Sequence, residues 1–295
     1  MKKQTVFIGS AVALVTPFKD GKIDYEAFGA LIDMHLNSKT DALVICGTTG
    51  ESSTLTDEEH VDAIRFAVEK SNKKKPIIAG TGSNDTEYSL WLSKEAEAAG
   101  ADALLLVTPY YNKATAKGLI KHFSRVADNV NIPSILYNVP SRTGCNIPLS
   151  VYKELCEHDN IVATKEASGN ISAIAEIAAE CAGKLDIYSG NDDQIVPVLS
   201  LGGKGVISVL ANVLPDETHD ICQLYFDGKV KESAALQLKY LDLINKLFCE
   251  VNPIPVKTAM ALMGKCGIEM RAPLCEMEES NKAALTAALK KHSII

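Results

Sequence analysis

The sequence predicts a (β/α)8 barrel followed by a C-terminal helical appendage. Eight apolar runs of strand length recur between residues 6 and 210. Stretches with helical apolar spacing separate them, and strand follows strand at intervals of roughly 25–33 residues, as βα units require. The runs are continuously apolar, as in Leu104–Val107, which is typical of parallel strands covered on both faces. A doubly wound sheet is the alternative, disfavoured by the eight regular units and the missing Gly-x-Gly-x-x-Gly fingerprint.

Each element is predicted from its local pattern. The strands are expected at Val6–Val15, Ala42–Cys46, Pro76–Gly80, Ala103–Thr108, Ser134–Asn138, Ile161–Thr164, Asp186–Ser189 and Gly205–Leu210. Helices between them are expected at Tyr25–Ser38, Glu58–Asn72, Thr86–Ala99, Ala116–Ala127, Leu149–Glu157 and Ile171–Cys181. Thr56 with Glu59 three residues later predicts a helix start, and Gly100 predicts a helix end.

The pattern changes after the eighth strand, and we expect a catalytic barrel at residues 1–228 and a helical appendage at 229–295. The appendage shows helical periodicity at Val230–Phe248, near Val256–Lys265 and at Met277–Lys291. Pro253 and Pro255 should separate its first two helices, because proline cannot continue a helix interior.

Composition excludes several classes of function. The chain has 295 residues, 46 % hydrophobic content and a net charge of −7, which favour a folded acidic protein over a disordered or nucleic-acid-binding one. No apolar stretch has the length of a membrane span, and the first residues do not form a signal peptide, so a cytoplasmic location is expected. The eight cysteines and six histidines are scattered without metal-ligand spacing, so we expect neither a metal nor a cofactor.

The candidate reactive group is Lys165, at the end of the apolar run Ile161–Thr164. Active sites of (β/α)8 barrels lie at the carboxyl ends of the strands. An amine that is partly removed from water there is biased toward its neutral, nucleophilic form and can make a Schiff base with a carbonyl substrate. The alternative is an ordinary solvated lysine that pairs with Glu166.

Other strand ends carry polar groups that favour the functional interpretation. The loop Gly47–Ser52 offers backbone amides and two threonine hydroxyls for a carboxylate. Further strands lead into Thr108–Asn112, Tyr137–Gly144 and Ser189–Asp192. The glycine-rich Gly202–Gly205 lacks the spacing of a phosphate loop and is interpreted as a turn. Hydroxyls, phenols, an arginine and a lysine thus fall at one end of independently predicted strands.

With these residues the chain resembles the pyruvate-dependent class I aldolases of the N-acetylneuraminate lyase family over nearly its whole length. The resemblance rests on Gly47–Glu51, Tyr110–Asn112, Tyr137–Gly144, Lys165–Ala167, Gly203–Ser208 and Asn252–Lys257. It implies a branch that condenses pyruvate with L-aspartate 4-semialdehyde through a lysine Schiff base. The product would be 4-hydroxy-tetrahydrodipicolinate, in lysine and diaminopimelate biosynthesis.

The resemblance also implies roles for particular residues. Lys165 would form the imine with pyruvate, whose carboxylate Thr48 and Thr49 would hold. Gly190 and Ile207 would complete the substrate site.

The same resemblance implies a proton relay of Thr49, Tyr137 and Tyr111, in which Tyr137 moves protons at the oxygen lost during imine formation. Arg142 would bind the carboxylate of the second substrate, because a guanidinium offers a planar fork.

Two other functions remain open. Another pyruvate aldolase could cleave a 2-oxo acid or N-acetylneuraminate, although that branch usually has serine where Thr48 stands and lacks the context of Arg142. A catalytically idle, sugar-acid-binding barrel would have no use for an imine-forming amine.

The resemblance further implies a homotetramer, a dimer of dimers, in which Tyr111 reaches the neighbouring subunit's site, with a dimer as the alternative. It also bears on inhibition by lysine. Some members bind lysine through positions that match Ser52, Ser53, Asp57, His60, Asn84, Tyr88 and Tyr110. The glutamate usual at Tyr88 and the histidine usual at Asp57 are absent here, so we expect weak inhibition or none.

Overall fold

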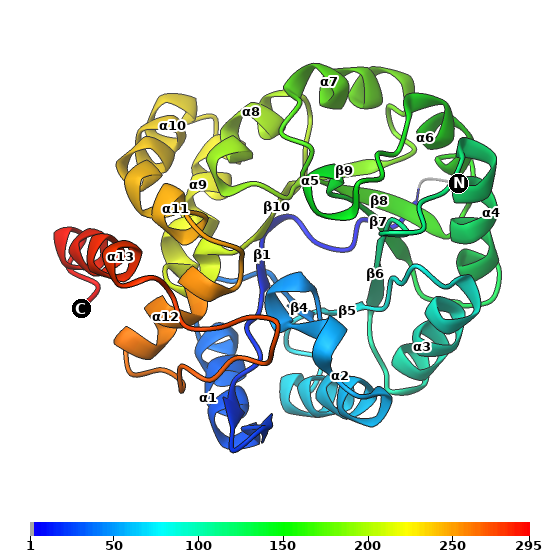
Figure 1. Cartoon of the computed structure of the whole chain (residues 1–295). Coiled ribbons are helices and arrows are strands. Elements are labelled where there is room, and N and C mark those ends of the chain that lie inside the picture. Colours follow the sequence, from blue (N-terminus) through cyan, green and yellow to red (C-terminus); the bar gives the residue numbers. More distant parts are fainter. Residues whose placement is uncertain (1–2) are drawn as a thin grey trace.

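Eight parallel strands form a closed barrel, which confirms the predicted (β/α)8 fold (Figure 1). The computed structural model describes residues 3–295. Around the barrel the order is β1-β10-β9-β8-β7-β6-β5-β4, so the last strand closes on the first. The strands are β1 (Gly9–Ala13), β4 (Ala42–Ile45), β5 (Ile77–Gly80), β6 (Ala103–Val107), β7 (Ser134–Asn138), β8 (Ile161–Glu166), β9 (Asp186–Ser189) and β10 (Gly205–Ser208).

Helices surround the barrel (Figure 1). Those that follow the barrel strands are α1 (Tyr25–Leu36), α2 (Asp57–Ser71), α3 (Thr86–Ala98), α4 (Ala116–Ala127), α5 (Pro140–Thr143), α6 (Leu149–Leu155), α7 (Ile171–Glu180), α8 (Ile195–Ser200) and α9 (Pro215–Phe226). Thr56 and Glu59 form the expected reciprocal cap of α2. Gly100 has a φ of 92° just past α3, where a residue without a Cβ is favoured.

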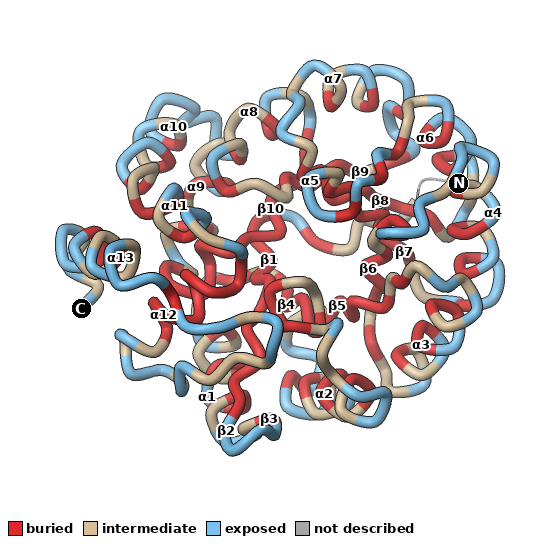
Figure 2. The backbone as a smooth tube through the Cα atoms, viewed as in Figure 1, coloured by how far each residue is buried: buried red, intermediate tan, exposed pale blue. Residues whose placement is uncertain are grey.

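The strands are buried on both faces, which explains their continuous apolar sequence (Figure 2). Inside the barrel, small and branched residues such as Ala11, Ala163 and Ile207 pack with Tyr137. A second, larger core lies between the strands and the helices. The barrel is therefore a packed core, and its chemistry belongs at its ends.

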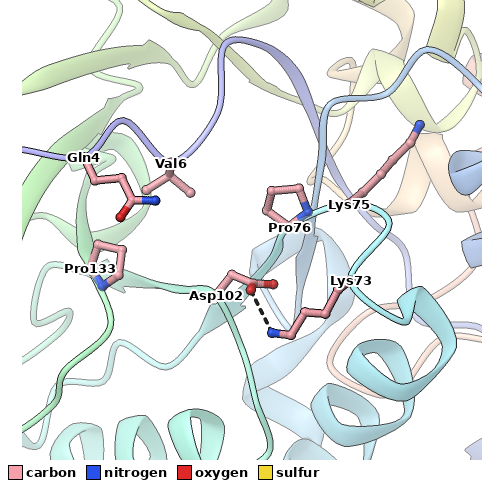
Figure 3. Close-up of a pocket in the computed structure, with 7 residues that line it drawn as sticks. All are labelled: Gln4, Val6, Lys73, Lys75, Pro76, Asp102 and Pro133. Carbon is pink, nitrogen blue, oxygen red and sulfur yellow. Dashed lines mark hydrogen bonds and ion pairs between the residues drawn. The ribbon is translucent and has the colours of Figure 1, made fainter.

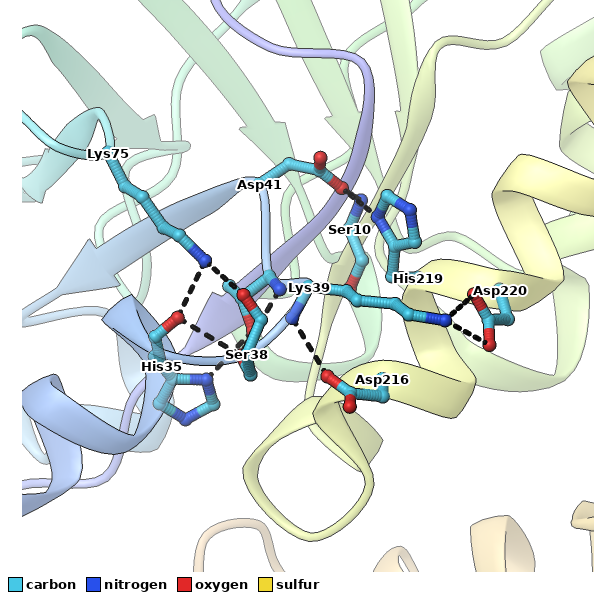
Figure 4. Close-up of polar contacts among 10 residues, drawn as sticks. Ser10, His35, Ser38, Lys39, Asp41, Lys75, Asp216, His219 and Asp220 are labelled. Carbon is cyan, nitrogen blue, oxygen red and sulfur yellow. Dashed lines mark hydrogen bonds and ion pairs between the residues drawn. The ribbon is translucent and has the colours of Figure 1, made fainter.

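The amino ends of the strands are closed by packing and polar contacts. The rings of Phe7 and Tyr188 stack with centroids 4.2 Å apart. Asp41, just before β4, accepts hydrogen bonds from the backbone amide of Ser10 at 2.7 Å and pairs with His219 of α9 at 2.8 Å (Figure 4). Such contacts at this end tie loops together and read as stability rather than catalysis.

The chain after α9 forms α10 (Val230–Lys239), α11 (Leu241–Leu247), α12 (Ile254–Leu262) and α13 (Glu279–Lys291). The prediction of one helix over Val230–Phe248 is wrong, because the helix breaks at Tyr240. Pro255 lies inside the first turn of α12, where its missing N–H costs nothing, so it does not separate helices. α13 packs against α11 and α12 on one side of the barrel (Figure 1).

A short hairpin, β2 (Phe18–Lys19) with β3 (Lys22–Ile23), was not predicted; it precedes α1. Gly202 has a φ of 89° in a turn before β10, as expected for this glycine-rich stretch. Within residues 3–295, no helix is both long and apolar enough to cross a bilayer.

Candidate active site

Lys165 lies at the carboxyl end of β8 and is only 6 % exposed. It pairs in register with Tyr137 on β7 and with Tyr188 on β9. Its Nζ atom lies 4.2 Å from the centre of the Tyr137 ring. The structure therefore brings these two sequence-predicted residues into contact, in a partly dehydrated place.

Glu166 does not pair with Lys165, because successive side chains of a strand point to opposite faces. Its carboxylate accepts hydrogen bonds from Tyr152 at 2.6 Å, Asn138 at 2.8 Å and Ser168 at 2.7 Å. Burial and the neighbouring Glu166 raise the pKa of Tyr152 well above its usual value, so this phenol remains a donor. The Glu166 carboxylate is thus hydrogen-bonded on the outer face of the strand. The Lys165 side chain lies on the opposite face, toward the barrel interior.

Gly190 packs closely against Lys165. A Cβ atom at Gly190 would lie 3.1 Å from Lys165 Cε and 2.7 Å from Ala167 Cβ. The Gly190 amide donates to the Glu166 carbonyl at 2.7 Å, which fixes this close approach. Ile207 is buried on β10 and belongs to the packed barrel interior.

Thr48 and Thr49 lie in a short 3-10 turn, Thr48–Gly50, directly after β4. Thr49 is buried, and its Oγ1 accepts a hydrogen bond from Asn252 Nδ2 at 3.0 Å. Asn252 is 203 residues away in the appendage, and its sequence motif alone indicates no role for it. The only signal in the sequence was the Asn252–Lys257 stretch itself.

Arg142 and Tyr111 are placed differently. Arg142 lies in α5 after β7 and is exposed, and its Nη1 is 3.4 Å from the Asn252 carbonyl oxygen. Tyr111 has a φ of 68° and is 90 % exposed, so its ring is not packed in this subunit's site. The single chain thus places Tyr137 and Gly190 at Lys165, links Thr49 and Arg142 through Asn252, and leaves Tyr111 exposed.

A cavity of about 360 Å³ lies at the carboxyl ends of the strands. It is lined by Thr48, Ser52, Ser53, Leu55, His60, Gly82, Ser83, Tyr88, Leu92, Val107, Tyr110, Val139, Arg142 and Thr143. A carboxylic acid of a few carbons fits such a volume, and hydroxyls and a guanidinium supply polar contacts.

The outer wall of this cavity carries no free carboxylate at position 87 or 88. The Tyr88 hydroxyl donates to Asp57 at 2.7 Å, and burial together with this bond raises the pKa of Tyr88 to about 12. Glu87 pairs with Arg125 of α4 at 2.9 Å. That contact holds the Glu87 carboxylate away from the cavity, which Tyr88 lines and Glu87 does not.

A second cavity lies at the opposite end of the barrel, and the two lysines that line it are bound to other groups (Figure 3). Lys73 is bound to Asp102 at 2.8 Å. Lys75 turns away and donates to the carbonyls of His35 and Ser38 (Figure 4). Both amines are already occupied by neighbouring groups.

Across the described residues 3–295, no group of three or more His, Cys, Asp or Glu side chains is arranged to hold a metal ion. All eight cysteines carry free thiols, and those of Cys46 and Cys222 are buried. The groups assembled at the site are amine, hydroxyl, phenol, amide and guanidinium, which suit carbonyl and carboxylate chemistry.

Comparison with known proteins identifies the family of this chain. The model of the dihydrodipicolinate synthetase family matches residues 6–292. A 4-hydroxy-tetrahydrodipicolinate synthase of Lachnoclostridium phytofermentans is 58 % identical over 98 % of this chain and 99 % of its own length.

Solved structures agree as well. The dihydrodipicolinate synthase of Aquifex aeolicus superposes with a TM-score of 0.96 at 45 % identity, covering 98 % of this chain and 99 % of that one. A monomeric dihydrodipicolinate synthase variant gives a TM-score of 0.96 at 38 % identity, covering 98 % of both chains. The present chain belongs to the dihydrodipicolinate synthetase family.

Proposed function

We propose that this enzyme condenses pyruvate with L-aspartate 4-semialdehyde to give 4-hydroxy-tetrahydrodipicolinate. Lys165 Nζ attacks the ketone carbon of pyruvate, and loss of water gives an iminium ion. The iminium nitrogen withdraws electrons, so the methyl group loses a proton and an enamine forms. The enamine carbon adds to the aldehyde, and the substrate's own amine then displaces Lys165 as the ring closes.

The observation that carries this proposal is the amine of Lys165, which is buried against the Tyr137 ring and borders Gly190, a residue without a side chain. Thr48 and Thr49 receive the pyruvate carboxylate from the turn after β4.

Tyr137 transfers the protons of carbinolamine formation and breakdown, because its phenol ring lies against the Lys165 amine, with Nζ 4.2 Å from the ring centre. Arg142 receives the carboxylate of the semialdehyde at the exposed rim of the cavity. No cofactor is needed, since the iminium ion itself is the electron sink.

The proposal is tested with the purified enzyme and two substrate sets. Pyruvate plus aspartate 4-semialdehyde should give the cyclic product, and N-acetylneuraminate should not be cleaved. Cleavage of N-acetylneuraminate with no condensation would assign the chain to the lyase branch. Borohydride trapping with pyruvate but turnover of neither set would indicate another 2-oxo acid substrate.

The exposed ring of Tyr111 supports assembly into a homotetramer. Asn112 braces this loop by donating to the Asn84 carbonyl at 2.9 Å, so an aromatic ring is held out in solvent. In this assembly residues 1–228 form the catalytic barrel, residues 229–295 the appendage, and Tyr111 completes the partner subunit's relay. The biosynthetic reaction supports a cytoplasmic location for the enzyme.

Mixed oligomers test this arrangement. A Tyr111→Phe chain combined with a Lys165→Ala chain should regain activity that neither shows alone. Verified mixed oligomers without recovery would place Tyr111 outside the partner's site.

A further inference from the structure

Asn252 carries a buried hydrogen-bond acceptor, its side-chain carbonyl oxygen. It is 5 % exposed, and its Nδ2 donates to Thr49 Oγ1 at 3.0 Å. Its Oδ1 atom is buried and has no hydrogen-bond partner within residues 3–295. Because an unpaired buried carbonyl is costly, its position beside a candidate catalytic hydroxyl points to a donor supplied from outside the chain.

The position of Asn252 indicates which donor this is. Its main-chain carbonyl oxygen lies 3.4 Å from Arg142 Nη1, and its side chain contacts Thr49. Asn252 therefore spans the gap between the residue assigned to the aldehyde's carboxylate and the residue assigned to pyruvate. In L-aspartate 4-semialdehyde the carboxylate and the ammonium are attached to the same carbon. A carboxylate held at Arg142 thus brings the ammonium close to Asn252.

The appendage holds Asn252 rigidly in this place. Lys257, one turn into α12, forms a fully buried ion pair with Glu51, which follows the Thr48–Gly50 turn. The Lys257 amine also donates to the Glu269 carbonyl at 2.6 Å. α12 is therefore clamped to the substrate turn at two points, Asn252 with Thr49 and Lys257 with Glu51, so the acceptor is preorganised.

We propose that Asn252 Oδ1 accepts a hydrogen bond from the ammonium group of the amino aldehyde and so selects it over aldehydes without an amine. A neutral amide suits this task, because a carboxylate at the same place would compete with the substrate for Arg142. At the same time Asn252 Nδ2 occupies a lone pair of Thr49, which turns the Thr49 hydroxyl proton away from Asn252. The inference rests on the proposed condensation and adds a determinant of its second substrate.

The test compares two aldehydes, L-aspartate 4-semialdehyde and succinate semialdehyde, which is the same chain without the amine. With enzyme in excess over pyruvate, acid-quenched samples are analysed for the seven-carbon addition product. Asn252→Ala should reduce the preference for the amino aldehyde by about tenfold or more, as expected for a lost hydrogen bond to a charged group. Thr49→Val should slow both aldehydes and leave the preference unchanged.

Asn281→Ala is the matched control, because it removes an amide hydrogen bond to Glu250 in the same appendage, away from the cavity. It should leave the rates and the preference as in the wild type. The aldehyde preference of the wild type is a second measurement, and it does not depend on how the variant folds. Equal use of both aldehydes by the wild type would overturn the proposal.

The inference and the proposed function fail differently. If Asn252→Ala slows both aldehydes by the same factor, Asn252 only positions Thr49 and the inference is wrong. Pyruvate with borohydride should still label Lys165 in Asn252→Ala. If the wild type is not labelled, the condensation mechanism fails, and the inference fails with it.

Discussion

Gly190 approaches Lys165 so closely that a single methyl group would occupy the space beside the reactive amine. A Cβ at Gly190 would lie 3.1 Å from Lys165 Cε, and the adjoining Ala167 Cβ would be only 2.7 Å away. The backbone φ angle of Gly190 is not positive, so residues with a side chain could adopt this conformation. Close approach, not backbone conformation, therefore requires glycine here.

Gly190→Ala should slow imine formation with pyruvate by about tenfold or more and reduce stability by about 1–3 kcal/mol, the usual range for overpacking. The rate of borohydride inactivation measures the first effect and urea denaturation the second. Gly118→Ala in α4, where the new Cβ would meet only the Ala114 and Thr115 side chains at 3.3 and 3.5 Å, is the control. If borohydride inactivated Gly190→Ala at the wild-type rate, Gly190 would not border the bound pyruvate.

The buried pair of Lys257 and Glu51 yields a stability prediction. Lys257→Met should lower the free energy of unfolding by about 3–5 kcal/mol, because it leaves the Glu51 carboxylate buried without its partner. Adding Glu51→Gln should restore part of that loss. Urea denaturation measures both. Lys153→Met, which breaks the exposed pair with Glu180, should have little effect, and an equally small effect of Lys257→Met would contradict this account.

The contact of His219 with Asp41 predicts a pH dependence of stability (Figure 4). The hydrogen bond to Asp41 raises the pKa of His219 above 6.5, supported by Asp220 and opposed by burial and Lys39. The protonated form is therefore favoured in the folded state. The contribution of protonated His219 to the free energy of unfolding is complete below 6.5, the pKa of the unfolded state. It is lost as pH rises through the higher pKa of the folded state.

Accordingly, His219→Ala should destabilise the enzyme more at about pH 5.5 than at about pH 8.5. Thermal melts of wild type and variant at the two pH values give the difference. His158→Ala, which removes a more exposed histidine paired with Asp128, is the comparison. If His219→Ala destabilised the enzyme more at high pH than at low pH, protonated His219 would not be the stabilising form.

L-lysine should inhibit weakly or not at all. The Tyr88 phenol is tied to Asp57, and Glu87 is tied to Arg125, so neither presents a free carboxylate to an amine in the cavity. Loss of one charge-assisted contact weakens binding by about ten- to a hundredfold. Titration of L-lysine into the assay is the measurement, and Tyr88→Glu should increase sensitivity. Half-inhibition of the wild type at submillimolar lysine would show that another group supplies the contact.

The barrel could be predicted from the sequence because parallel strands covered on both faces remain apolar throughout, as at Leu104–Val107. Lys165 could be singled out because it ends such a run. The hairpin at Phe18–Ile23 was missed although Asp20-Gly21 is a recognised turn pair. The break at Tyr240 has no glycine or proline to mark it, so helical periodicity alone could not reveal it.

The contacts that finish the site could not be predicted, since they join distant segments. Asn252 meets Thr49 across 203 residues, and Lys257 meets Glu51 across 206. Such pairs depend on how the appendage packs against the barrel, which local pattern does not encode. The placement of Tyr111 outside its own subunit's site depends likewise on backbone geometry, a φ of 68°.

The central claim is that Lys165 forms an imine with pyruvate, and borohydride reduction tests it most directly. In the presence of pyruvate, borohydride should inactivate the enzyme, and peptide mapping should find one reduced pyruvate adduct, on Lys165. Lys165→Ala should fold and carry no adduct. An adduct on another lysine, or none in the wild type, would contradict the account.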